Sequence, residues 1–138
     1  MEEQQAPERF TVSVGMGAGL VRISVAGELD QGFATLLERV ATEAWAVASA
    51  SGLVLDLRGL TFCDSRCVGV LLLLLRQSRE QKAALVVAGV PQRLERILTM
   101  TGLRAMFRVE PSLEAAIEVV RAWRESQGSP DRSEKNSP

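Results

Sequence analysis

Histidine and tyrosine are absent from this chain of 138 residues, and cysteine occurs only twice, at Cys63 and Cys67. Without an imidazole, the chain has no Ser-His or Cys-His nucleophile pair and no histidine-containing metal site. The two cysteines lack a second pair of thiolates, so they would leave a metal half coordinated and cannot form a disulfide framework. We therefore expect no enzyme activity, no metal and no cofactor, and a reducing cytoplasm as the natural compartment.

An excess of either charge is also missing, because 16 Lys and Arg residues balance 17 Asp and Glu residues. The net charge of -1 gives no general attraction to nucleic-acid phosphates, so nucleic acid is not an expected partner. The longest apolar run, Cys67 to Leu75, is well short of the roughly 20 residues that span a bilayer. The first residues are acidic and polar, unlike a secretory signal, and we expect a cytoplasmic protein without membrane insertion.

The length of the chain predicts one domain, because so short a chain cannot build two independent cores. Residues 1–8 are mainly polar, and residues 125–138 contain no aliphatic or aromatic side chain. Such segments cannot bury enough apolar surface to offset the entropy cost of ordering them. We expect disordered tails over residues 1–8 and 125–138, and a folded domain over residues 9–124.

The hydrophobic period changes repeatedly between two residues and 3.6 residues, which indicates mixed α and β structure. Alternating apolar residues predict a hairpin of two strands, over 10–14 and 21–25, around a glycine-rich turn at 15–19. The predicted helices are 31–50 with Asp30 as the cap, 66–80 with Ser65 as the cap, one beginning near Pro91, and one carrying Leu113 to Val120. The predicted later strands are 53–57, 84–88 and 106–109, with a loop over 58–64.

Strand-helix-strand units of this kind require parallel pairing and right-handed crossovers. We therefore predict an α/β fold, with a small mixed sheet of four or five strands, helices mainly on one face and the opening hairpin at the edge. A doubly wound sheet covered on both faces is the alternative.

Several short motifs occur in a characteristic order along this pattern. They are Gly27-Glu28-Leu29-Asp30, then Leu55-Asp56-Leu57, Phe62, Asp64-Ser65, Gly69-Val70-Leu71-Leu72, Thr101-Gly102-Leu103 and the strand around Phe107 and Val109. In this order they resemble the STAS family, specifically its anti-anti-sigma factors, over about Phe10 to Trp123. The resemblance implies a cytoplasmic switch protein that binds an anti-sigma factor, itself a serine kinase with a histidine-kinase-like ATPase fold. Binding frees a sigma factor, and phosphorylation of one serine ends the binding.

The family serine directly follows an aspartate in the pattern Asp-Ser-Ser/Thr-Gly-Leu-Gly, so the resemblance assigns Ser65 as the phosphoacceptor. The chain departs from this pattern at Arg66, Cys67 and Val68. A side chain at Cys67 either obstructs docking of the kinase or changes the choice among related partners. The residues expected at the partner contact are Glu28, Asp30, Asp64, Arg66, Cys67 and Gly69.

Each of these residues also has a simpler structural interpretation. Ser65 and Asp30 are good helix caps, Asp64 and Glu28 fit a solvated turn and a strand end, and Gly69 permits close packing. A scaffold of the same fold without a phosphorylation switch, or a transporter-associated subunit, is the main functional alternative, and Arg66 and Cys67 favour it. An enzyme with Asp64 or Ser65 as nucleophile is disfavoured because no imidazole base is present.

Overall fold

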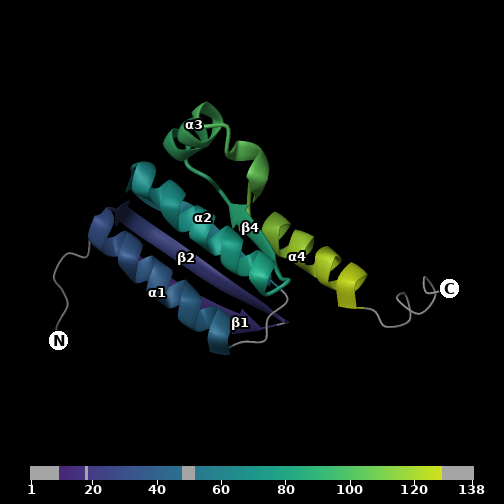
Figure 1. Ribbon diagram of the computed structural model, residues 1–138. Helices are drawn as coiled ribbons and strands as arrows, with labels where there is room; N and C mark the ends of the chain where they lie inside the picture. Colours follow the sequence, from purple (N-terminus) through teal and green to yellow (C-terminus); the bar gives the residue numbers. More distant parts are fainter. Residues whose placement is uncertain (1–9, 18, 48–51, 129–138) are drawn as a thin grey trace, which may run out of the picture.

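The computed structural model describes residues 10–17, 19–47 and 52–128, which form one five-stranded sheet with four α-helices (Figure 1). The strands lie in the spatial order β1-β2-β3-β4-β5; β1 is antiparallel to β2, and all later neighbours are parallel. The mixed sheet and its edge hairpin confirm the predicted fold class. In chain order the elements are β1 (Phe10–Gly17), β2 (Leu20–Leu29), α1 (Gln31–Val47), β3 (Gly52–Cys63), α2 (Ser65–Glu80), β4 (Ala84–Ala88), α3 (Gln92–Met100), a 3-10 turn (Arg104–Met106), β5 (Arg108–Glu110) and α4 (Leu113–Gly128).

Two hydrophobic clusters lie on opposite faces of the sheet. On β3, Leu53 and Leu55 face the larger cluster, which α1, α2 and α3 cover, whereas Val54 between them faces Ala116 and Val120 of α4. This alternation follows from the two-residue period of a strand that is buried on both faces. Three helices therefore share one face, as predicted, and α4 covers β3, β4 and β5 from the other side (Figure 1).

The strand β3 is much longer than predicted. The loop expected over residues 58–64 is wrong, since residues 58–63 belong to this strand. The strand continues to Cys63 and stays paired with β2, although the register shifts twice on the way. Gly59 makes this irregular pairing possible: a Cβ at this position would lie 2.9 Å from the Cβ of Ala26. Exposed residues interrupt the apolar pattern in this part of β3, so the sequence indicated a loop.

Other boundaries differ from the predictions by a few residues. The glycines expected in the hairpin turn, Gly15 and Gly17, belong to β1, and the last strand is β5 rather than 106–109. Helix α4 continues to Gly128, so residues 125–128 are helical rather than disordered; each added residue extends the hydrogen-bonded ladder without a new nucleation cost. Residues 1–8, 48–50 and 129–138, for which tails and the end of the first helix were predicted, lie outside the described residues.

A buried carboxylate on β3 is neutralised by a neighbouring cation. Asp56 is 6% exposed, and its two oxygens accept hydrogen bonds of 2.9 Å from Nε and Nη2 of Arg58. The backbone N–H of Arg58 donates a further bond of 3.1 Å. These hydrogen bonds hold the pKa of Asp56 below its usual value of 3.8, against the opposing effect of burial.

We predict that Asp56→Asn lowers the free energy of unfolding by about 1.5–3 kcal/mol at neutral pH, because a neutral amide replaces a doubly paired anion. A lowered pKa in the folded state gives stability that is present above pH 3.8 and is lost as the pH falls toward the folded pKa. The difference between wild type and variant, measured by urea denaturation, should therefore shrink below pH 3.8.

Glu118→Gln, which removes an exposed pair with Arg121, is the control and should change stability by less than about 0.5 kcal/mol. An Asp56→Asn cost that is equal at pH 7 and pH 3 would contradict the assignment.

Candidate functional site

The candidate site lies where the carboxyl ends of β2 and β3 meet. The two strands are parallel, and their last residues, Leu29 and Cys63, are paired in register. Each strand is followed by one aspartate, Asp30 or Asp64, and then directly by a helix. The register therefore brings the two aspartate turns and the N-termini of α1 and α2 to the same edge of the sheet. This supports the expectation that the Asp30 turn lies beside the serine turn.

Both aspartates cap the helices that follow them. Asp30 accepts a hydrogen bond of 3.2 Å from the backbone N–H of Phe33, and Asp64 accepts one of 2.9 Å from that of Arg66. The predicted cap at Ser65 is wrong: Asp64 has the extended backbone of a capping residue, with φ of -130° and ψ of -163°, and Ser65 is the first helical residue. Ser65 is an exposed residue at the helix start.

Arg66 lies on the surface beside this serine and pairs with the cap. Its Nη1 atom donates to Oδ2 of Asp64 at 2.7 Å, while the backbone N–H of the same arginine occupies Oδ1. Half of the Arg66 side chain remains accessible to solvent. Arg66, which stands where the family pattern has a small hydroxyl residue, therefore neutralises Asp64, the residue before Ser65.

The structure corrects the prediction that the side chain of Cys67 contributes to a partner contact. Cys67 is only 2% exposed and points into the core, so it neither obstructs nor touches a docking protein. A hydrogen bond with Cys63 and burial both raise the pKa of the Cys67 thiol far above its usual value. In contrast, Gly69 is exposed, and among the described residues no atom lies within 4 Å of a Cβ built there. Packing among the described residues therefore does not require a glycine at this position.

Two residues at this edge were not identified from the sequence. Phe62 is 41% exposed next to Glu28, its partner in register on β2. The guanidinium carbon of Arg93, in the first turn of α3, lies 5.8 Å from the centre of the Phe62 ring. Phe62 was noted only as one of the family motifs, in a segment assigned as loop, and no pattern in the sequence pointed to Arg93. We call the resulting set the strand-end surface: Glu28, Asp30, Phe62, Asp64, Ser65, Arg66, Gly69 and Arg93.

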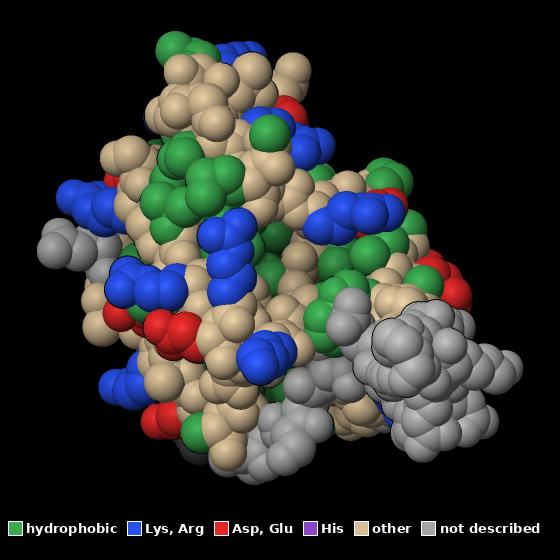
Figure 2. Space-filling model, turned by 45° about the vertical axis from the view of Figure 1, so that its right-hand side comes forward, with side chains coloured by type: hydrophobic (Ala, Val, Ile, Leu, Met, Phe, Trp, Pro, Cys, Tyr) green, Lys and Arg blue, Asp and Glu red, His purple; other side chains and the backbone are tan. Residues whose placement is uncertain are grey.

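The strand-end surface mixes charged and apolar side chains. Figure 2 shows one face of the whole molecule, on which apolar side chains form separate patches with basic side chains between them. Within the described ranges, no three Cys, Asp or Glu side chains gather to hold a metal ion, and no helix is long and apolar enough to span a membrane.

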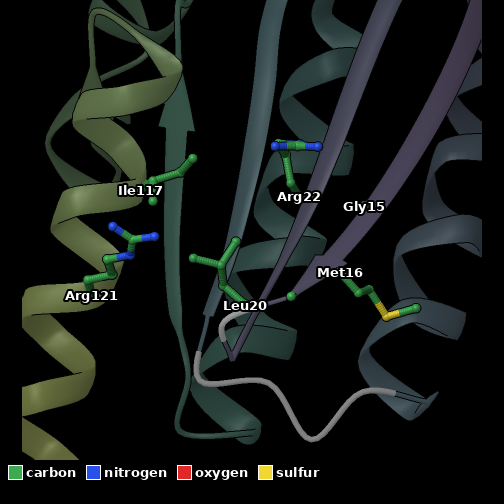
Figure 3. A pocket seen from close by; sticks show the side chains of 7 residues that line it. Gly15, Met16, Leu20, Arg22, Ile117 and Arg121 are labelled. Atoms are coloured by element: carbon green, nitrogen blue, oxygen red, sulfur yellow. The ribbon is translucent and has the colours of Figure 1, made fainter.

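A hollow of about 260 Å³ lies elsewhere, between the β1–β2 hairpin and α4. Figure 3 shows Arg22 on β2 and Arg121 on α4 beside it, with Leu20 and Ile117 between them. Leu20 is the first residue of β2, whereas the strand-end surface lies at the last residues of β2 and beyond them. The hollow is therefore separate from the turns that carry Asp30 and Ser65.

Comparison with known proteins identifies the fold. The family described as "Mlab, STAS domain" matches residues 12–110. The crystal structure of an anti-sigma factor antagonist from Mycobacterium paratuberculosis is 29% identical, with a TM-score of 0.71 over 86% of this chain and 99% of that chain. The anti-sigma factor antagonist SpoIIAA in its unphosphorylated form is 20% identical, with a TM-score of 0.70 over 81% of this chain and 97% of that chain. Phosphorylated SpoIIAA, a Bacillus cell fate determinant, is also 20% identical, with a TM-score of 0.65 over 80% of this chain and 99% of that chain.

The matched region begins in β1 and ends in β5, so it includes the whole strand-end surface. The fold is thus that of a STAS domain. This chain belongs to the STAS-domain family, and its solved neighbours include anti-sigma factor antagonists.

We predict that Asp64→Ala lowers the free energy of unfolding by about 1 kcal/mol, because the first turn of α2 loses its cap. Asp64→Asn should cost less, since an amide oxygen still accepts from Arg66, and Ser65→Ala should change stability by less than about 0.5 kcal/mol. Urea denaturation of the three variants measures these differences. A larger loss for Ser65→Ala than for Asp64→Ala would contradict the capping geometry.

Proposed function

We propose that this protein is an anti-anti-sigma factor, which binds an anti-sigma factor serine kinase through the strand-end surface and thereby releases a sigma factor in the cytoplasm. The observation that carries the proposal is the exposure of Ser65 as the first residue of α2, directly after Asp64 and beside the Asp30 turn. A kinase reaches this residue without any rearrangement of the domain. In the family that the chain resembles, a serine in this place after an aspartate is the phosphoacceptor.

The local chemistry is suited to a phosphate. The first backbone N–H groups of a helix lack intrahelical acceptors, and the helix dipole favours negative charge at this end. The guanidinium of Arg66 is half exposed next to Ser65 and would bind a phosphate in competition with Asp64. A phosphorylated Ser65 therefore keeps the fold intact.

The same phosphate changes what a partner meets. It adds roughly 1.5 to 2 negative charges at neutral pH to a surface that already carries Glu28, Asp30 and Asp64. A partner that docks on the uncharged hydroxyl would have to desolvate this charge or approach it with its own acidic groups. Phosphorylation is thus expected to end binding through charge at the contact, without unfolding α2.

A second candidate function is a STAS scaffold or transporter-associated subunit that acts only by binding, with no switch. The pairing of Arg66 with Asp64 favours it, because both oxygens of the carboxylate already accept hydrogen bonds from Arg66 and leave the aspartate less free to orient the serine hydroxyl. The two candidates differ in one respect, which is whether modification of Ser65 alters binding.

The test uses the purified protein, ATP and a serine kinase of the histidine-kinase-like ATPase fold from the same genome. Intact mass and peptide mapping should show one phosphate on wild type, located at Ser65, and none on Ser65→Ala. Ser65→Ala should retain binding of the kinase, and Ser65→Asp should weaken it at least tenfold, measured by calorimetry. Both variants should remain folded, because Ser65 does not cap the helix.

Thr61→Ala is the matched control, since Thr61 is an exposed hydroxyl residue four positions earlier on β3. It should be phosphorylated and should bind like wild type. Phosphate on another residue would refute the assignment of Ser65. Equal binding by wild type, Ser65→Ala and Ser65→Asp would favour the scaffold.

A further inference from the structure

The strand β1 has an open edge. Among the described residues it pairs only with β2, so its outer edge presents backbone N–H and C=O groups without sheet partners. Proteins usually protect such edges with charged side chains, prolines or very short strands. The eight residues of β1, Phe-Thr-Val-Ser-Val-Gly-Met-Gly, include no charge and no proline. The described part of this edge therefore carries none of these three protective features.

The second half of β1 is also uncovered on its faces. Val14 is 44% and Met16 is 58% exposed, although their partners in register, Ile23 and Val21, are buried in the core under α1 and α2. On the other face, Ser13 and Gly17 are exposed, because α4 packs on β3, β4 and β5. Figure 3 shows Met16 pointing away from the side of the sheet that carries Arg22 and α4.

The opposite edge of the sheet does not offer a matching strand. β5 has only three residues, two of which, Arg108 and Glu110, form an ion pair of 2.8 Å, and Pro111 follows directly. Pairing of β1 with β5 of another copy would bury these charges and would generate an open filament. The neutral strand β1 is instead complementary to itself, since antiparallel pairing places no charged residues opposite each other.

We propose that two copies of this chain dimerise by antiparallel pairing of their β1 strands about a two-fold axis, which joins the two sheets into one. In a register centred on Val14, the exposed Met16 of each copy lies opposite Val12 of the other, and Val14 packs against Val14. Ser13 then faces Gly15, and Thr11 faces Gly17. Within each pair the two residues lie on the same face of the joined sheet, as the two-residue period requires. The pairs of Val12, Val14 and Met16 lie on one face, and those of Thr11 and Ser13 lie on the other. The proposal does not depend on the function of Ser65.

The first test measures the mass of the full-length protein by light scattering after gel filtration, over a wide range of concentration. The wild type should have the mass of a dimer. Val14→Lys should have the mass of a monomer and an unchanged circular dichroism spectrum, because a charge at the centre of the interface would face its own copy. Met100→Lys, at an exposed apolar residue of α3, is the matched control and should remain dimeric.

The second test does not depend on how well Val14→Lys folds. Val14→Cys should form a disulfide-linked dimer under mild oxidation, whereas Met100→Cys should not, and the native Cys63 and Cys67 are buried. A monomeric wild type, or a dimer that persists in Val14→Lys, would overturn the proposal, as would the absence of a Val14→Cys crosslink. A monomeric wild type whose binding to a kinase partner is lost in Val14→Lys would instead assign the edge to a strand of that partner.

Discussion

The parallel register of β2 and β3 is the constraint on which the candidate site depends. Because Leu29 pairs with Cys63, the two following aspartates and the two helices that they cap begin at the same edge of the sheet. Side-chain capping by Asp64 fixes the extended turn that places Ser65 at the first helical position, where the residue is exposed. A shift of one residue in this register would place the side chains of Leu29 and Cys63 on opposite faces of the sheet and would change the alignment of the two turns.

The two faces of the sheet are covered unequally, and this asymmetry produces the remaining surface features. The helices α1 and α2 cover β2 and β3 from one side, whereas α4 packs on β3, β4 and β5 and reaches β2 only near Leu20. The hollow with Arg22 and Arg121 lies where α4 leaves the hairpin uncovered. Within residues 10–17, 19–47 and 52–128, β1 pairs only with β2, and Val14 and Met16 in its second half remain exposed.

Where the sequence pattern was regular, it predicted the elements correctly. The alternation of Val21, Ile23 and Val25 and the apolar run Leu53–Leu57 identified strands, and Asp30 was correctly predicted as a cap. The second half of β3 was missed because its pairing depends on a glycine and two register shifts, which no local pattern encodes. The choice between Asp64 and Ser65 as the cap could not be made from composition, since both are good caps and only the backbone conformation decides. The burial of Cys67 follows from its angular position on α2, which depends on where that helix begins.

The two surfaces inferred here share no residue, and the exposed centre of the β1 contact lies away from the turns of the strand-end surface. Val14 and Met16 are opposite Ile23 and Val21, near the start of β2, whereas Asp30 follows its end. Pairing through β1 would extend the sheet sideways and leave the turn at Ser65 accessible in both copies. If Ser65 is the phosphoacceptor as proposed, both copies offer it, since no residue of the strand-end surface belongs to β1. A dimer would present two such surfaces on one rigid sheet and so would favour partners that are themselves two-fold symmetric.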